Sequence, residues 1–301
     1  MNARELVLSA VALTVFASAF TLIRITLTEL PPLTVGALRF ILSSTLIVPL
    51  AFFLPSQKGF HFDRRDVPIL VGLSVVQIFV PNFLQNIGLE YTTAAVSSVL
   101  QSTPPMFALV LAFAFFKERA SWQQVAGMIV AMTGVALLST GGDLSNLARS
   151  QLLGNIMQVG VGASYAFSGI MGKRLLSKYP PLQIVALTFV VGGGLLTVVA
   201  ILFERSYWPT SLSFDVIIAL VMLSFLYCVG LVAWYKVLKT TGVFSLYVLL
   251  FIMPVLAVAI SITVLHENFT VLDVLFSAIT LLGVGISEFR IGRGRGRSLP
   301  T

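Results

Sequence analysis

Charged residues are scarce in this sequence: they make up 10% of its 301 residues, whereas soluble domains carry about a quarter. The chain is instead 57% hydrophobic, with a mean hydropathy of +0.98, and these values exclude a water-soluble fold. Cysteine and histidine are almost missing as well. The single Cys228 cannot form an intrachain disulfide, and His61 and His266 lack the Cys or His partners that a zinc site requires. We therefore expect no metal, no cofactor and no redox chemistry.

Long apolar runs take the place of the missing charges. About 20 apolar residues in a helix can cross the hydrocarbon core of a bilayer. The first run is too long for the apolar region of a secretory signal, so we expect it to be retained as a helix. Cutting the sequence at charges and at Pro/Gly turns predicts an all-α integral membrane protein with ten transmembrane helices, at 6–28, 33–54, 66–89, 93–116, 121–141, 152–175, 181–203, 214–238, 242–265 and 270–289.

Lysine and arginine are distributed unevenly over the connections between these spans. With the N-terminus inside the cell, 15 of the 19 basic residues lie on the cytoplasmic side and two on the other side, while Arg24 and Arg39 fall within spans. Cytoplasmic loops carry the excess of positive charge, so both termini are predicted to be cytoplasmic. The basic tail at 291–301 directly follows the last span, and we interpret it as a cytoplasmic anchor at anionic lipid rather than a nucleic-acid site.

The sequence also contains an internal repeat. The segment "ELPPLTVGALRF" at 29–40 aligns with "KYPPLQIVALTF" at 178–189, an offset of 149 residues that needs no gap. We expect a first repeat at 1–141, a linker at 142–151 and a second repeat at 152–290. Five helices per repeat is an odd number, so the two copies enter the membrane from opposite sides. Inverted repeats of this kind favour a carrier that works by alternating access, although a duplication can also be kept for folding alone.

Polar and aromatic residues recur at helical spacing in the middle of several predicted spans. We expect their faces to turn inward around a central cavity, because lipid offers them no hydrogen bonds. For any single residue, the alternative is a hydrogen bond that only holds two helices together. The candidate substrate-binding residues are Ser18, Thr21, Asn82, Gln85, Asn86, Ser97, Gln101, Ser164, Tyr165, Ser168, Tyr227 and Trp234.

Two prolines and one arginine are further candidates. Pro105 and Pro254 are related by the repeat offset near the centres of their predicted spans, where they predict either hinges beside a binding site or simple kinks. Arg39 lies about 9 Å inside its span, too deep to reach the interface easily. Its repeat partner is Thr188, so the shared fold does not require a cation there. Contact with an anionic substrate and a structural pairing both remain open.

Machinery for chemistry or energy coupling is missing from the spans. All twelve acidic residues lie in predicted loops or at helix ends, whereas proton- or sodium-coupled carriers usually keep a carboxylate at mid-membrane. Facilitated transport or exchange is therefore favoured over a proton relay. The sequence also lacks a Walker loop, a nucleophile elbow and an HExxH motif, which leaves a membrane enzyme or a scaffold with little support.

The repeat units resemble a known family. "TTAAVSSVLQSTPPMFALVLAFAFFKERASWQQVAGMIVAMTGVALL" and "MPVLAVAISITVLHENFTVLDVLFSAITLLGVGI" are similar to the EamA-type domains of the drug/metabolite transporter superfamily. The resemblance implies a bacterial inner-membrane exporter of amino acids, of broad specificity and including aromatic ones, with ten helices around a central cavity. Efflux of aromatic or cationic drugs, or of other metabolites, is the alternative. The expected partners are a small-molecule substrate and the lipid bilayer, and a monomer is compatible with this reading.

Overall fold

The fold is described from a computed structural model, in which residues 2–53, 62–88, 91, 100, 103–116, 121–143, 152–205, 211–253, 255–256, 259–260 and 270–288 are placed. Every element assigned among these residues is a helix. The elements are α1 (Ala3–Thr26), α2 (Pro32–Phe53), α3 (Val67–Ser74), the π-helix η1 (Val75–Phe79), α4 (Val80–Gly88), α6 (Pro104–Phe116), α7 (Trp122–Thr140), α9 (Leu152–Leu176), α10 (Pro181–Glu204), α11 (Phe214–Thr240), α12 (Val243–Val248), the 3-10 helix η3 (Leu249–Phe251) and α14 (Val271–Glu288).

Five helical segments are long and apolar enough to cross a membrane: Ala3–Ile23, Pro32–Phe52, Val67–Gly88, Pro181–Glu204 and Phe214–Thr240. They carry large apolar side chains on their outer faces, such as Leu50 on α2, Leu202 on α10 and Phe225 on α11. An exposed apolar surface of this extent matches lipid rather than water. The chain is therefore a multi-pass membrane protein. The expected spans 93–116 and 242–265 lie partly outside the described residues.

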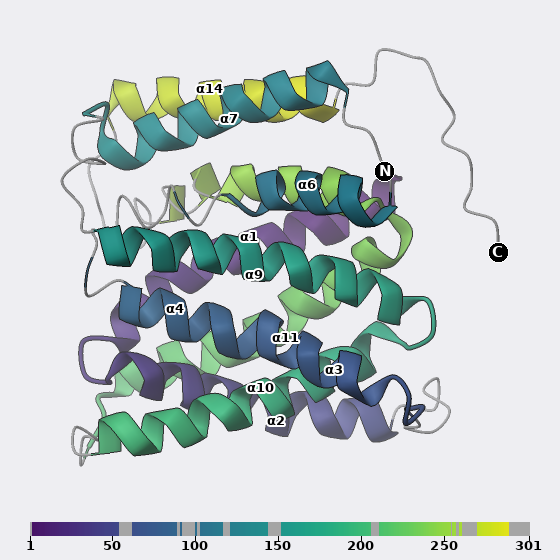
Figure 1. The fold of residues 1–301 in the computed structure, drawn as a ribbon. Coiled ribbons are helices and arrows are strands. Elements are labelled where there is room, and N and C mark those ends of the chain that lie inside the picture. Colours follow the sequence, from purple (N-terminus) through teal and green to yellow (C-terminus); the bar gives the residue numbers. More distant parts are fainter. Residues whose placement is uncertain are drawn as a thin grey trace.

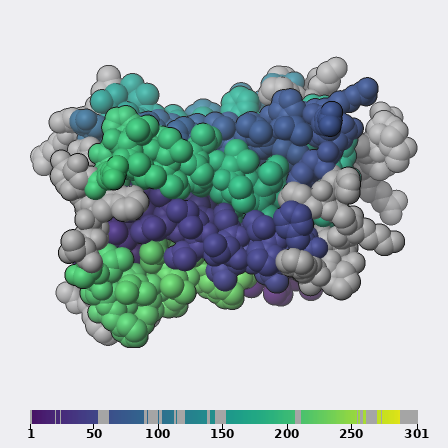
Figure 2. All heavy atoms as spheres, turned by 90° about the horizontal axis from the view of Figure 1, so that it is seen from below, coloured from purple at the N-terminus to yellow at the C-terminus, as the bar shows by residue number. Residues whose placement is uncertain are grey.

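The helices are stacked in layers (Figure 1). Helices α7 and α14 pack together at one end of the stack, and α2 and α10 pack together at the other end. Between these pairs, α1 packs against α11, and α9 packs against α4 and α6. Figure 2 looks onto the end formed by α2 and α10, which lie side by side between the α3–α4 segment and α11.

Helices α2 and α10 run antiparallel, and so do α7 and α14. Thr34, at the start of α2, bonds to Glu204, at the end of α10. On α7 and α14, Gly127 faces Gly283 and Ser287, while Gly134 faces Thr280. A Cβ at Gly127 would lie 2.6 Å from the Gly283 carbonyl oxygen, so glycine is what lets these two backbones touch.

The π-helix η1 has a local cause in the sequence. Pro81 has no N–H, so it cannot donate to a carbonyl one turn back. In a π-helix each N–H donates to the carbonyl five residues back, as Val80 does to Val75. The residue that would donate to the Val76 carbonyl is therefore Pro81, so this carbonyl has no backbone donor. The Ser164 hydroxyl of α9 donates to it at 2.7 Å. Ser164 therefore stabilises a wide turn in the neighbouring segment.

Polar contacts join helix ends on both sides of the molecule. At one side, the backbone N–H of Ser213 donates to Glu29 at 2.9 Å. At the other side, Lys178 donates to Asp66 at 2.9 Å, and the Tyr179 hydroxyl donates to the same carboxylate at 2.8 Å. These two hydrogen bonds lower the pKa of Asp66 below its ordinary value of 3.8. Each contact ties the end of one helix to the start of another helix far away in the sequence.

Candidate functional site

Arg39 is the most unusual side chain in the described part of the protein. It lies on the third turn of α2, about 10 Å from the start of that helix, and is only 5% exposed. A guanidinium group stays protonated in proteins, so its charge is buried together with the side chain. Charged groups at such a depth are expensive and are functional suspects by default.

One amide orients the guanidinium. Arg39 Nη2 donates to Asn82 Oδ1 at 2.7 Å, and Asn82 Nδ2 donates to the carbonyl of Ile78 at 2.7 Å. The second bond turns the amide oxygen toward the arginine. Arg39 Nε is buried and has no hydrogen-bond partner among the placed residues.

Two aromatic rings flank the same guanidinium. Its Cζ lies 4.5 Å from the ring centroid of Phe40 and 4.7 Å from that of Tyr227, on α11. Both distances are within the range of a cation–π contact. The hydroxyl end of Tyr227 lies close to the side chains of Tyr165 and Gln77. The charge is thus held at a junction of both halves of the sequence.

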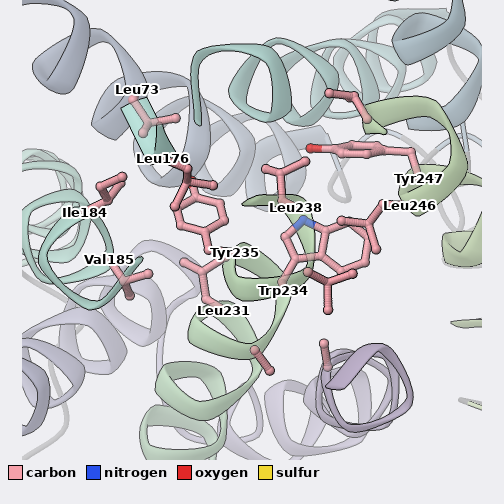
Figure 3. Close-up of a cluster of buried hydrophobic side chains, with 14 of the residues drawn as sticks. Leu73, Leu176, Ile184, Val185, Leu231, Trp234, Tyr235, Leu238, Leu246 and Tyr247 are labelled. Atoms are coloured by element: carbon pink, nitrogen blue, oxygen red, sulfur yellow. The ribbon is translucent and has the colours of Figure 1, made fainter. Parts of the chain in front are cut away.

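The aromatic group continues beyond Arg39. The ring of Tyr227 lies 5.8 Å from Phe189 and 5.8 Å from Phe16, and Phe16 lies 6.0 Å from Trp234. Trp234 in turn lies 5.5 Å from Tyr247, which extends the group to α12 (Figure 3). Such spacings are typical of stabilising ring pairs. The result is a nearly continuous cluster of packed aromatic rings contributed by α1, α2, α10, α11 and α12.

No carboxylate compensates the arginine within the described ranges. The one ion pair recorded there joins Lys178 and Asp66 at a helix end. Glu204, on α10, is bound instead to the start of α2, where it accepts from Leu33 N, Thr34 N and the Thr34 hydroxyl at 2.9, 2.7 and 2.8 Å. The contacts recorded for Arg39 are therefore an amide and two rings, all of them neutral.

The structure brings together several of the candidates named from the sequence. Asn82 contacts Arg39, Tyr227 flanks it, and Trp234 belongs to the same aromatic group. Tyr165 is half-buried, and its carbonyl accepts a hydrogen bond from the Tyr247 hydroxyl at 2.7 Å. Ser164 supports the π-helix beside them.

Other candidates make contacts away from Arg39. Asn86 Nδ2 donates to the carbonyl of Pro32, and the Gln85 carbonyl accepts from Gln158. Ser18 and Ser168 each donate to a carbonyl of their own helix, three residues back. Thr21 is buried on α1.

The remaining candidates are placed only in part. Pro105 lies in the first turn of α6, which begins at Pro104, while Thr103 before it is not helical. Its role as a hinge stays a prediction. Ser97, Gln101 and Pro254 lie outside the described residues.

Sequence reasoning missed part of this site. Phe40 and Phe189 read as ordinary core residues, because an apolar residue in a membrane span carries no sign of what it touches. Gln77 was detectable, since it is a polar residue in the middle of a span. Pro81 was also detectable as the cause of an irregular turn.

Within the described ranges there is no group of three His, Cys, Asp or Glu side chains that could hold a metal ion. What the arrangement offers is a buried cation beside a cluster of aromatic rings, two chemical features that a small anionic molecule with an apolar part would match.

Comparisons with known proteins identify the fold. A solved crystal structure superposes with a TM-score of 0.80 at 17% sequence identity, covering 96% of this chain and 98% of the other. An uncharacterized transporter of Archaeoglobus fulgidus is 26% identical over 94% of this chain and 97% of its own length. A probable terminal-alkyne amino-acid exporter of Streptantibioticus cattleyicolor is 26% identical over 78% of each chain.

The family comparison covers almost the whole sequence. Residues 4–140 and 152–288 each match the EamA-like transporter family. Together with the buried site and the apolar outer surface, this match means that the protein is a membrane transporter for a small molecule. The chain belongs to the EamA-like transporter family.

Proposed function

We propose that this transporter exports amino acids, with broad specificity that includes aromatic ones, from the cytoplasm across the bacterial inner membrane. The observation that carries the proposal is the buried Arg39 beside the rings of Phe40 and Tyr227. A guanidinium group recognises a carboxylate, and the rings provide a surface for an apolar or aromatic side chain. The related Streptantibioticus protein, named a probable amino-acid exporter, is further support.

Alternating access between two inverted five-helix repeats is the proposed mechanism, with both termini cytoplasmic. Under the repeat offset, α2 corresponds to α10 and α7 corresponds to α14. Each of these helices packs against its own counterpart and runs antiparallel to it, which is what inversion requires. The offset also relates the pair α1 and α11 to the pair α9 and α3–α4. If α1 and α11 took up the packing now seen between α9 and α3–α4, and the reverse, the site would open to the other side.

Efflux of cationic drugs is the competing hypothesis. Within the aromatic group, the rings of Phe40 and Tyr227 already have the guanidinium of Arg39 over them. A second cation would be repelled by the first. The site therefore favours amino acids over cations.

A transport screen tests the proposal. Purified protein in liposomes is given labelled amino acids and cationic dyes, and Trp234→Ala and Gln101→Ala are compared with wild type. We expect transport of amino acids and a clear loss in Trp234→Ala, because Trp234 is 5% exposed and packs on Phe16 and Tyr247. Trp122→Ala is the matched control, since Trp122 is 77% exposed at the start of α7. Transport of dyes without amino acids would contradict the proposal.

A further inference from the structure

We infer that Arg39 is the receptor for the substrate's carboxylate, and that the site accepts aromatic carboxylates whether or not they carry an amino group. The inference deepens the proposed function, on which it rests, by naming the charge that the substrate has to bring. It also gives Arg39 a role in specificity, because a molecule without a carboxylate has nothing to pair with the guanidinium.

The first step is the unbalanced charge. A buried guanidinium normally pairs with a carboxylate, because removing one member of such a pair leaves an uncompensated charge. The contacts recorded for Arg39 in the described residues are the amide of Asn82 and the rings of Phe40 and Tyr227, which carry no net charge. An anionic ligand would complete the pair.

The second step is the direction of the free donor. Nη2 is engaged by Asn82, while the buried Nε has no partner in the described part of the chain. Guanidinium groups bind carboxylates through two adjacent N–H groups, and on the Nε edge these are Nε–H and one N–H of Nη2, which carries two N–H groups and donates one hydrogen bond to Asn82. A carboxylate on that edge would satisfy Nε.

The third step concerns the amino group. An α-ammonium group ordinarily pairs with a carboxylate. Two carboxylates in the described residues are engaged away from Arg39: Glu204 accepts hydrogen bonds at the start of α2, and Asp66 is paired with Lys178. The amino group of an amino acid therefore gains little here. Its removal should leave binding intact.

The repeat offset does not duplicate this receptor in the second copy. The residue that corresponds to Arg39 in the second copy is Thr188, which is fully buried on α10 and donates to the Val185 carbonyl of its own helix at 2.9 Å. Within the described residues, the position on α10 that corresponds to Arg39 therefore holds no cation.

Three probes separate the chemical requirements: phenylalanine, 3-phenylpropionate, which lacks the amino group, and phenethylamine, which lacks the carboxylate. Binding to purified protein is measured by thermal shift, and transport is measured in proteoliposomes. Wild type is expected to bind and transport the first two probes and to ignore the third. Binding of phenethylamine, or failure to bind 3-phenylpropionate, would overturn the inference.

Two variants test the role of Arg39 itself. Arg39→Gln removes the charge, whereas Asn82→Asp keeps it and places a carboxylate where the amide oxygen now lies, 2.7 Å from Nη2. Both should weaken binding of the two carboxylates by about 30-fold or more, because each deprives the ligand of an unpaired buried charge. Asn82→Asp gains an ion pair with Arg39 but loses the hydrogen bond that Asn82 Nδ2 donates to the Ile78 carbonyl. Thermal unfolding without ligand is therefore measured for both variants, and the variant that unfolds like wild type decides the question.

Control variants and the outcomes complete the design. Arg65→Gln removes an exposed arginine from the loop before α3, and Asn155→Asp makes the same amide-to-acid change in the first turn of α9, where a helix N-terminus favours an acid. Both should bind like wild type. Wild-type binding of the carboxylates by Asn82→Asp would refute the inference while leaving amino-acid export intact. Carboxylate binding that depends on Arg39 but is accompanied by no transport would instead refute the proposed function.

Discussion

Glu204 offers a direct test of how the two halves of the chain are held together. Its carboxylate, at the end of α10, accepts three hydrogen bonds from the start of α2: Leu33 N, Thr34 N and the Thr34 hydroxyl. Pro32 has no N–H, so Glu204 satisfies the first two backbone donors of that helix. A side chain from one half therefore caps a helix of the other half.

The magnitude follows from those contacts. Loss of an N-cap costs about 1 kcal/mol, and a negative charge at a helix N-terminus contributes about 0.3 to 1 kcal/mol more where it is partly exposed. We expect Glu204→Ala to lower the free energy of unfolding by about 2 kcal/mol. Glu204→Gln should cost about 1 kcal/mol, because the amide keeps one acceptor oxygen but loses the charge.

Thermal unfolding in detergent, followed by intrinsic fluorescence, measures the effect. For a protein of this size, about 1 kcal/mol corresponds to about 2 °C in Tm, so Glu204→Ala should unfold about 4 °C earlier than wild type. Glu29→Ala is the matched control: Glu29 is an exposed carboxylate that contacts Ser213 alone among its recorded partners, with Ser213 N donating to it at 2.9 Å. A Tm loss in Glu29→Ala equal to that in Glu204→Ala would refute the capping argument.

Two further predictions concern topology and pH. Ser177 and Ser211 lie at exposed positions before and after α10. In a Cys228→Ser background, an impermeant thiol reagent added to intact cells should label Ser211→Cys and not Ser177→Cys. Labelling of Ser177→Cys alone would reverse the proposed orientation. The pKa of Asp66 is lowered by the hydrogen bonds from Lys178 and Tyr179, so its contribution to stability is present above its ordinary value of 3.8 and is lost as the pH falls through the lower folded-state pKa. Asp66→Asn should therefore unfold at a lower temperature than wild type at pH about 7, and the difference should shrink only once the pH falls below 3.8 and through the lower folded-state pKa of Asp66; a difference that already disappears well above 3.8 would contradict this linkage.

The sequence was sufficient for the membrane class and the family, because hydropathy acts on each span separately. A run such as Pro181–Glu204 is apolar enough to be recognised without any knowledge of its neighbours. The repeat offset likewise needs only the residues themselves. Arg39 stood out for the same reason, since one charge in an apolar span is visible by itself.

What surrounds Arg39 was not visible in the same way. Asn82 was one polar candidate among many, and its place opposite the guanidinium depends on how the segment after the π-helix is turned. The Phe40 and Tyr227 rings come from helices far apart in the chain. Lipid is equally apolar on every side of a helix, so hydropathy does not specify which faces meet.

Only the tertiary structure decided these lateral contacts. Glu204 read from the sequence as one more acid at a helix end, and its three bonds to α2 require that α10 ends beside the start of that helix. The close approach of α7 and α14 likewise depends on glycines that face each other across the pair. Burial in the membrane selects which segments become helices, whereas backbone contact and the pairing of polar groups select which helices become neighbours.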